Sequence, residues 1–97
     1  MKRSNRTPLF NLGGIVATPG AIDLLGRTGT TAVSLLIRHQ CGDWGIVCPA
    51  DRKSNDLAVS EGARILSVYA LGAGAEKIWI ITDADRCATT ALLPSEY

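Results

Sequence analysis

The chain has 97 residues, which is enough for one small domain and too short for two. Hydrophobic residues make up 46% of the chain, a proportion that excludes an intrinsically disordered protein. The formal net charge of +1 excludes a global basic field that would draw the protein onto nucleic acid.

The overall pattern predicts a soluble cytoplasmic protein with no membrane partner. No signal peptide is visible, and no segment approaches the roughly 20 apolar residues that span a bilayer. The 3 cysteines are odd in number and not tightly spaced, unlike a secreted disulfide framework. We expect residues 1–11 to form a tail and residues 12–97 a single domain. Lys2, Arg3 and Arg6 make the tail basic, which fits a solvated terminus more simply than a binding patch.

Residues 12–20 predict a short strand that leads directly into a helix. The strand has an apolar centre with glycines on both sides. Thr18 can cap the free N–H groups of the helix, and Pro19 suits its first position. The helix would end at Gly26 or Gly29. Its apolar anchors would be Ile22, Leu24 and Leu25.

Residues 30–40 predict a second helix, capped by Thr30 or Thr31. Its apolar positions form a broad face, which predicts the most buried helix of the domain. These positions are Ala32, Val33, Leu35, Leu36 and Ile37. Gly42 stands where a left-handed helix terminus belongs.

Residues 44–62 predict an extended segment followed by a third helix. The segment up to Pro49 fits either a short edge strand or an extended loop. Residues 50–62 predict a polar helix that rests on the core through Leu57, Ala58 and Val59.

The last third of the chain predicts three strands, at 63–72, 76–84 and 89–97, because it is rich in β-branched and aromatic residues. The short connections between them require antiparallel neighbours. We therefore expect an α+β domain, with an antiparallel sheet of three or four strands and two or three helices mainly on one face. Both sheet faces carry apolar side chains. The sequence leaves open whether a second copy of the chain covers the outer one as a homodimer.

Residues 38–45, RHQCGDWG, combine the only histidine with an arginine, a cysteine, a carboxylate and a tryptophan. A zinc site would need Cys or His in tight local pairs, which Cys41, Cys48, Cys87 and His39 do not form. The glycine-rich segment near the N-terminus lacks the lysine of a P-loop and the spacing of a dinucleotide fingerprint. No Gly-x-Ser-x-Gly elbow is present. We therefore expect no metal and no cofactor.

Metal-independent RNA cleavage is the catalytic interpretation that remains. His39 could be its acid or base, since the pKa of histidine lies near neutrality. The groups able to hold phosphate are Arg38, Arg64, Ser67, Thr82, Arg86, Thr89 and Thr90. The structural interpretation uses the same segment. Cations near a helix C-terminus are favoured by the helix dipole, Asp43 would bond a nearby backbone or arginine group, and Trp44 would cover the helix end.

Residues 82–90 raise the same alternatives. Asp83, Asp85 and Arg86 could hold a ligand, but aspartate also builds tight turns by bonding its own backbone. The turn is the simpler interpretation.

Four segments resemble a family of small proteins carried by plasmids and integrative elements. They are LGGIVATPGAIDLL, RHQCGDWG, ARILSVY and IWIITDADRCATTALLPSEY, and they cover nearly the whole chain from Leu12 to Tyr97. Members are often labelled plasmid-related proteins. Others are given a restriction-modification name, although a chain of this length is too short for a methyltransferase domain. The resemblance implies a mobile-element context, in which small proteins block host defences by binding or cut RNA as toxins.

We therefore predict a non-enzymatic accessory protein of a mobile genetic element that binds a host protein or nucleoprotein complex, as anti-defence inhibitors do. Its binding residues would be Arg38, His39, Asp43, Trp44, Arg64, Asp83, Asp85, Arg86, Thr89 and Thr90. The alternative is a toxin-like, metal-independent endoribonuclease with RNA as its partner and His39 as its catalytic residue.

Overall fold

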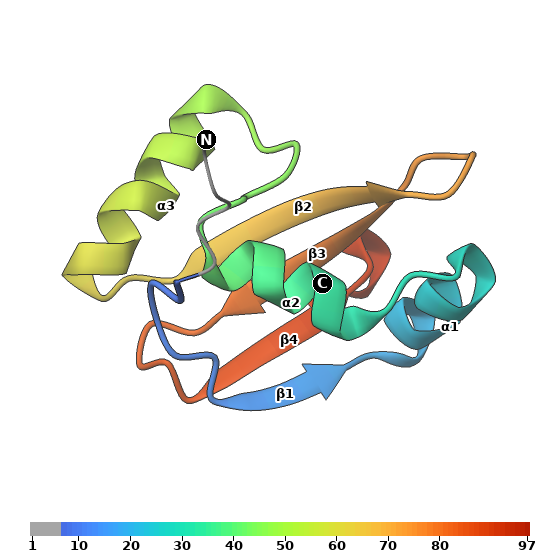
Figure 1. The fold of residues 1–97 in the computed structure, drawn as a ribbon, viewed down its shortest axis with the longest axis horizontal. Coiled ribbons are helices and arrows are strands. Elements are labelled where there is room, and N and C mark those ends of the chain that lie inside the picture. Colours follow the sequence, from blue (N-terminus) through green and yellow to red (C-terminus); the bar gives the residue numbers. More distant parts are fainter. Residues whose placement is uncertain (1–6) are drawn as a thin grey trace.

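The computed structural model describes residues 7–97, so the basic cluster near the N-terminus lies outside the described residues. Its elements, in chain order, are β1 (Gly14–Ala17), α1 (Pro19–Thr28), α2 (Ala32–Gln40), α3 (Pro49–Glu61), β2 (Ile65–Leu71), β3 (Glu76–Thr82), β4 (Ala88–Leu92) and a short 3-10 helix η1 (Pro94–Glu96). Figure 1 shows one sheet with helices packed against it. The predicted α+β class is confirmed.

The sheet has the order β1-β4-β3-β2. Strands β2, β3 and β4 form the predicted antiparallel meander. Strand β1 joins the sheet but runs parallel to β4, so the sheet is mixed and not purely antiparallel. The physical reason is the connection between them. A tight turn imposes antiparallel pairing, whereas β1 and β4 are joined through all three α-helices and two strands, which allows the parallel direction.

The main core lies between one face of the sheet and helices α1 and α2 (Figure 1). Its buried residues are Ala21, Leu24, Leu25, Leu35, Tyr69, Leu71, Ile78, Ile80 and Ala91. A second cluster joins α3 to the start of β2, and its buried residues are Phe10, Trp44, Val47, Ala58 and Ile65. On the opposite sheet face, the ring of Tyr97 contacts that of Trp79 at 5.4 Å between centroids.

The predicted starts of α1 and α2 are confirmed, with Thr31 as the cap of α2, whereas α3 begins at Pro49, one residue before the predicted segment. The Thr18 hydroxyl accepts a hydrogen bond from the Ala21 N–H at 3.2 Å, and the Thr31 hydroxyl accepts one from the Ser34 N–H at 3.2 Å. Gly29 ends α1 in the left-handed region with φ of 66°. These local signals operate within a few residues, so they hold whatever the tertiary fold.

The prediction that 30–40 is the most buried helix is wrong. Only Leu35 and His39 of α2 are buried, while Val33 is 64% exposed and Ile37 is 38% exposed. Residues two positions apart on a helix point about 200° away from each other. The stripe with Leu35 therefore cannot be buried together with the stripe that contains Val33 and Ile37. The apolar set is broader than the face that the sheet can cover.

Two residues predicted as apolar anchors of the other helices are in fact exposed. Ile22 is 59% exposed and Leu57 is 52% exposed. Helix α1 is buried through Ala21 and the predicted Leu24 and Leu25, and α3 is buried through Asn55 and the predicted Ala58. Ile22 and Leu57 each lie next to a buried residue, and adjacent positions on a helix point about 100° apart.

The last strand is shorter than predicted. Strand β4 stops at Leu92, because Pro94 cannot donate to a strand ladder and begins the 3-10 helix η1 instead. This turn brings Glu96 back to the start of α1, where its carboxylate accepts hydrogen bonds from the Thr18 hydroxyl and from the Gly20 N–H at 3.0 Å. Its negative charge complements the positive end of the α1 dipole.

Candidate functional site

The structure brings the segment 38–45 and the region 82–90 together around the ring of His39. Its Nδ1 lies 2.6 Å from the Ser67 hydroxyl on β2, and its Nε2 lies 2.9 Å from the Thr82 hydroxyl on β3. Ser67 and Thr82 stand on the core face of neighbouring strands, where Thr82 pairs with Ile65, two residues from Ser67. His39, near the C-terminal end of α2, therefore contacts two adjacent strands through its imidazole.

The hydrogen bonds continue as a chain with a defined direction. The Thr82 hydroxyl lies 2.7 Å from that of Thr89, and the Thr89 hydroxyl donates to the Leu12 carbonyl oxygen at 2.7 Å. Because a carbonyl can only accept, Thr82 must donate to Thr89 and must itself accept from His39 Nε2. From this network we assign the neutral Nε2–H tautomer, with Nδ1 accepting from Ser67.

The environment of His39 keeps it neutral. The side chain has 0% exposure, and its ring makes edge contacts with Phe10 at 5.3 Å and Trp44 at 6.0 Å between centroids. Burial, with a smaller effect from the positive charge of Arg86, lowers the pKa of His39 to about 4. A buried neutral imidazole with a hydrogen bond at each of its two nitrogens stabilises one arrangement of the core. It is not an accessible acid or base near neutral pH.

Arg38 and Asp43 form a half-exposed unit at the end of α2. Arg38 Nε lies 2.7 Å from Asp43 Oδ2, and its guanidinium stacks 4.4 Å above the centroid of the Tyr69 ring. The Tyr69 hydroxyl donates to the Asp43 carbonyl oxygen at 2.6 Å. The bond from Arg38 lowers the pKa of Asp43. The unit fastens the turn after α2 to the sheet.

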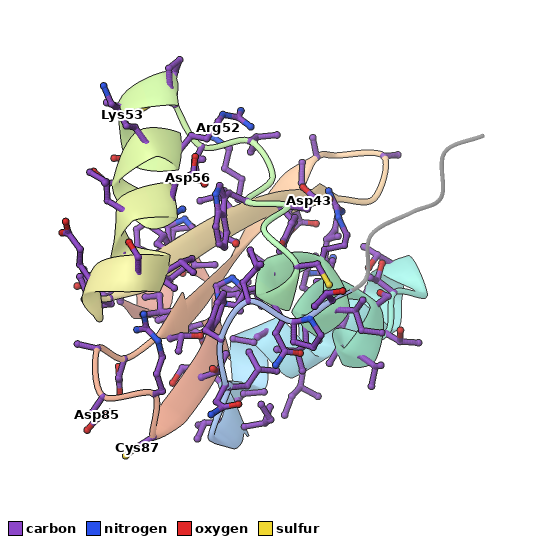
Figure 2. The ribbon with its side chains drawn as sticks, turned by 60° about the vertical axis from the view of Figure 1, so that its left-hand side comes forward. Asp43, Arg52, Lys53, Asp56, Asp85 and Cys87 are labelled. Atoms are coloured by element: carbon purple, nitrogen blue, oxygen red, sulfur yellow. The ribbon has the colours of Figure 1, made fainter. Side chains whose placement is uncertain are left out.

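Trp44, predicted either as a contact residue or as a cover for the helix end, is 2% exposed. Its indole N–H donates to Asp56 Oδ1 on α3 at 2.9 Å. Figure 2 shows Asp56 on the side of α3 that faces this segment, whereas Lys53 projects away from it. Trp44 therefore covers the helix end and anchors α3, and it offers almost no surface to a partner.

Arg86 is half-buried, and its guanidinium is occupied by carbonyl groups of the fold itself. Its guanidinium donates to the carbonyl oxygens of Ala63 at 2.6 Å and Ala58 at 2.8 Å, beyond the end of α3 and on its last turn. It also donates to the Asp83 carbonyl at 3.1 Å in its own turn. The backbone of Arg86 is left-handed, with φ of 61°. Arg86 thus ties the β3–β4 turn to α3.

Arg86→Lys is expected to lower the free energy of unfolding by about 2 kcal/mol, because an ammonium group cannot reproduce the guanidinium fork. Urea unfolding would measure the loss. The control is Arg64→Lys, since Arg64 is exposed and bonds the exposed Tyr97 hydroxyl at 2.9 Å. Equal losses in both variants would contradict the role assigned to Arg86.

The remaining predicted site residues do not converge on one surface. Asp85 Oδ1 accepts the Cys87 N–H at 2.9 Å, as in an aspartate-built turn, and Figure 2 shows both side chains at the outer end of the molecule. Asp83 is exposed in the same turn. Thr89 is buried on the core face, and the adjacent Thr90 points to the opposite face.

A different surface stands out on the outer side of α2, which we call the α2 outer surface and define by Pro8, Leu9, Val33, Ile37 and Cys41. A shallow depression there is lined by Pro8, Ser34, Ile37, Arg38, Gln40 and Cys41. The Leu9 N–H donates to the Gln40 carbonyl at 2.8 Å, which holds the segment before β1 against the end of the helix. The spacing of Val33 and Ile37, one helical turn apart and opposite the buried stripe, is the sequence signal that could have identified it.

Within residues 7–97, no group of three or more His, Cys, Asp or Glu side chains is arranged to hold a metal ion. Cys41, Cys48 and Cys87 are free thiols. Among the helices formed by the described residues, none has the length and apolar character needed to cross a membrane. Comparison of the chain with protein-family models, curated proteins and solved structures finds no match.

Proposed function

We propose that this is a non-enzymatic accessory protein that acts by binding a protein partner through the α2 outer surface. The observation that carries the proposal is the 64% exposure of Val33 beside Ile37 on a helix whose opposite side is packed in the core. Contiguous exposed apolar side chains rimmed by polar ones are typical of protein contact surfaces. Arg38, at the edge of the depression, adds a residue type that is common in such surfaces.

The resemblance in sequence supplies the class of partner. It supports a mobile-element protein that binds a host protein or nucleoprotein complex in the cytoplasm, as anti-defence inhibitors do. Small inhibitors of this kind need a stable domain and a complementary surface, and they need no organised catalytic centre. The α2 outer surface would supply the complementary surface, and it includes no group from the His39 network.

Binding is favoured over the endoribonuclease alternative by the surroundings of His39. RNA cleavage needs an acid or base that reaches the 2′-hydroxyl or the leaving oxygen. His39 is fully buried, with a pKa of about 4, and its nitrogens already bond Ser67 and Thr82. A substrate would have to displace the core to reach it.

Val33→Asp combined with Ile37→Asp is expected to reduce capture of a host partner from lysate at least about tenfold, because charges would be buried in the contact. Both side chains are exposed, so the fold should tolerate the changes. The matched control is Leu57→Asp on α3, where the replaced side chain is 52% exposed. Quantitative mass spectrometry of the captured proteins would measure the difference.

Two outcomes would contradict the proposal. The first is capture that the α2 double variant retains in full. The second is cleavage of total RNA in excess EDTA by the native protein but not by a folded His39→Gln variant, which would establish a metal-independent ribonuclease instead. Circular dichroism would confirm that each variant is folded under the assay conditions.

A further inference from the structure

The two edge strands of the sheet, β2 and β1, differ in whether their outward backbone groups are hydrogen-bonded. On the β2 edge, the Asn55 side chain bonds both backbone groups of Leu66, donating to its carbonyl at 2.7 Å and accepting its N–H at 3.2 Å. Two residues along, the Val68 N–H donates to the Trp44 carbonyl at 3.0 Å, and the Val68 carbonyl accepts the Ile46 N–H at 2.8 Å. This edge is therefore blocked by the protein's own groups.

The β1 edge has no such cover from residues 7–97. The Gly14 N–H donates to Cys87 at 2.9 Å and the Thr18 N–H donates to Ala91 at 3.0 Å, so alternate residues of this strand face β4. The intervening Ile15 and Ala17 must direct their N–H and C=O groups away from the sheet. Figure 1 shows β1 as the outermost strand on this side, with no other described element beyond it.

The β1 edge is short, at four residues, but it lacks the other usual protections against strand pairing. Natural proteins guard such edges with charges, proline or bulges. Residues 13–18 read Gly-Gly-Ile-Val-Ala-Thr, without charge or proline, and β1 pairs with β4 in continuous register. Ile15 is 50% exposed and Val16 is 51% exposed. The edge therefore offers free backbone groups flanked by apolar side chains, which is the surface that an extended strand recognises.

We propose that the occupant of this edge is β1 of a second copy of the chain, paired antiparallel about a twofold axis at Val16. In this register, Ile15 of each copy exchanges both of its outward backbone hydrogen bonds with Ala17 of the other. The two Val16 residues face each other as a non-hydrogen-bonded pair, the arrangement with the closest side chains. The two sheets then form one continuous sheet.

The composition of the strand favours a second copy over a charged or irregular partner. An isologous contact sets each residue against its own counterpart or a near neighbour, so any charge near the axis would be repelled by itself. The segment 13–18 contains none. The pairing involves one short strand from each copy, so we expect a weak dimer with a dissociation constant between about 1 µM and 1 mM.

The test is sedimentation equilibrium of the full chain between about 1 µM and 1 mM. The expected result is a monomer–dimer equilibrium. Val16→Glu and Val16→Lys should each raise the dissociation constant at least about tenfold, because like charges would face each other across the axis. An equimolar mixture of the two variants should recover the native value to within about threefold, because the charges then attract.

Two further variants keep the test specific. Ile15→Pro removes an outward N–H without removing a bond between β1 and β4, so it should abolish the dimer and keep the fold. Val33→Glu, on the α2 outer surface, should leave the dimer unchanged and so separates this proposal from the proposed function. A protein that is monomeric at 1 mM would overturn the proposal. So would a dimer that Val33→Glu disrupts, or one for which the mixed Val16 variants, folded by circular dichroism, show no recovery.

Discussion

Acidification is expected to remove about 2 kcal/mol of the free energy of unfolding by pH 5, and about 3 kcal/mol by pH 4, through His39 alone. In the folded protein, burial lowers the pKa of His39 to about 4, against 6.5 for an unperturbed histidine. The unfolded chain therefore binds a proton at a pH where the folded protein cannot. The stabilisation is complete above pH 6.5 and is lost as the pH falls from 6.5 to 4.

Urea unfolding of the native protein and His39→Gln at pH 7, 6 and 5 would measure this effect. The native protein should lose stability across the series. The glutamine variant, which has no group titrating in that range at this position, should show a flat profile above pH 5. It should also be less stable at pH 7 by about 2–3 kcal/mol, because glutamine cannot reproduce the ring contacts with Phe10 and Trp44.

This pH series distinguishes the titration of His39 from that of the carboxylates. The bond from Arg38 lowers the pKa of Asp43, and the bond from Thr18 lowers that of Glu96. The stabilisation from these carboxylates is lost as the pH falls below the range of unfolded carboxyl groups, at more acidic pH than the histidine effect. Parallel profiles for the native protein and His39→Gln between pH 7 and 5 would contradict the buried, neutral state of His39.

Gly45→Ala is expected to lower the free energy of unfolding by at least about 3 kcal/mol. Gly45 has φ of +77°, and a Cβ added there would lie 1.9 Å from the Val68 carbonyl oxygen. That contact is with backbone, so relief requires the segment from Trp44 to Ile46 to move away from β2. The bonds of this segment with Val68 and the packing of Trp44 would weaken together.

Gly62→Ala is the matched control. Gly62 ends α3 with φ of +72°, but nothing lies within 4 Å of the added Cβ. Alanine there bears only the cost of a left-handed backbone, about 1 kcal/mol. Denaturant unfolding of both variants would measure the difference. Equal losses would show that the close approach of Gly45 to β2 is not a tight constraint.

Sequence reasoning anticipated the elements whose signals are local. Thr18 followed by Pro19 marks a helix start, and Gly29 is one of the two predicted ends of that helix, because caps and left-handed positions involve only a few neighbouring residues. Short connections required the antiparallel meander for the same reason. For the segment 38–45, the sequence indicated a helix terminus followed by a turn, which is the structure observed.

Sequence reasoning could not anticipate contacts between residues far apart in the chain. Ser67 and Thr82 were considered as phosphate-holding groups, whereas they bond the ring of His39 from two different strands. Arg86 was considered as a contact residue, but its guanidinium bonds the Ala58 carbonyl on α3 and the Ala63 carbonyl beyond its end. A polar residue can lie at the surface or in the interior with its hydrogen bonds satisfied, and composition does not distinguish the two. Only the fold decides between them.

The sequence by itself determined the class of the domain, the caps of α1 and α2 and the antiparallel meander, because each follows from local backbone chemistry. Only the tertiary structure decided that β1 runs parallel to β4 and that α2 turns Val33 and Ile37 outward. The sheet can cover one stripe of a helix, and which stripe it covers depends on the direction of approach. The same arrangement buries His39 and leaves the β1 edge open.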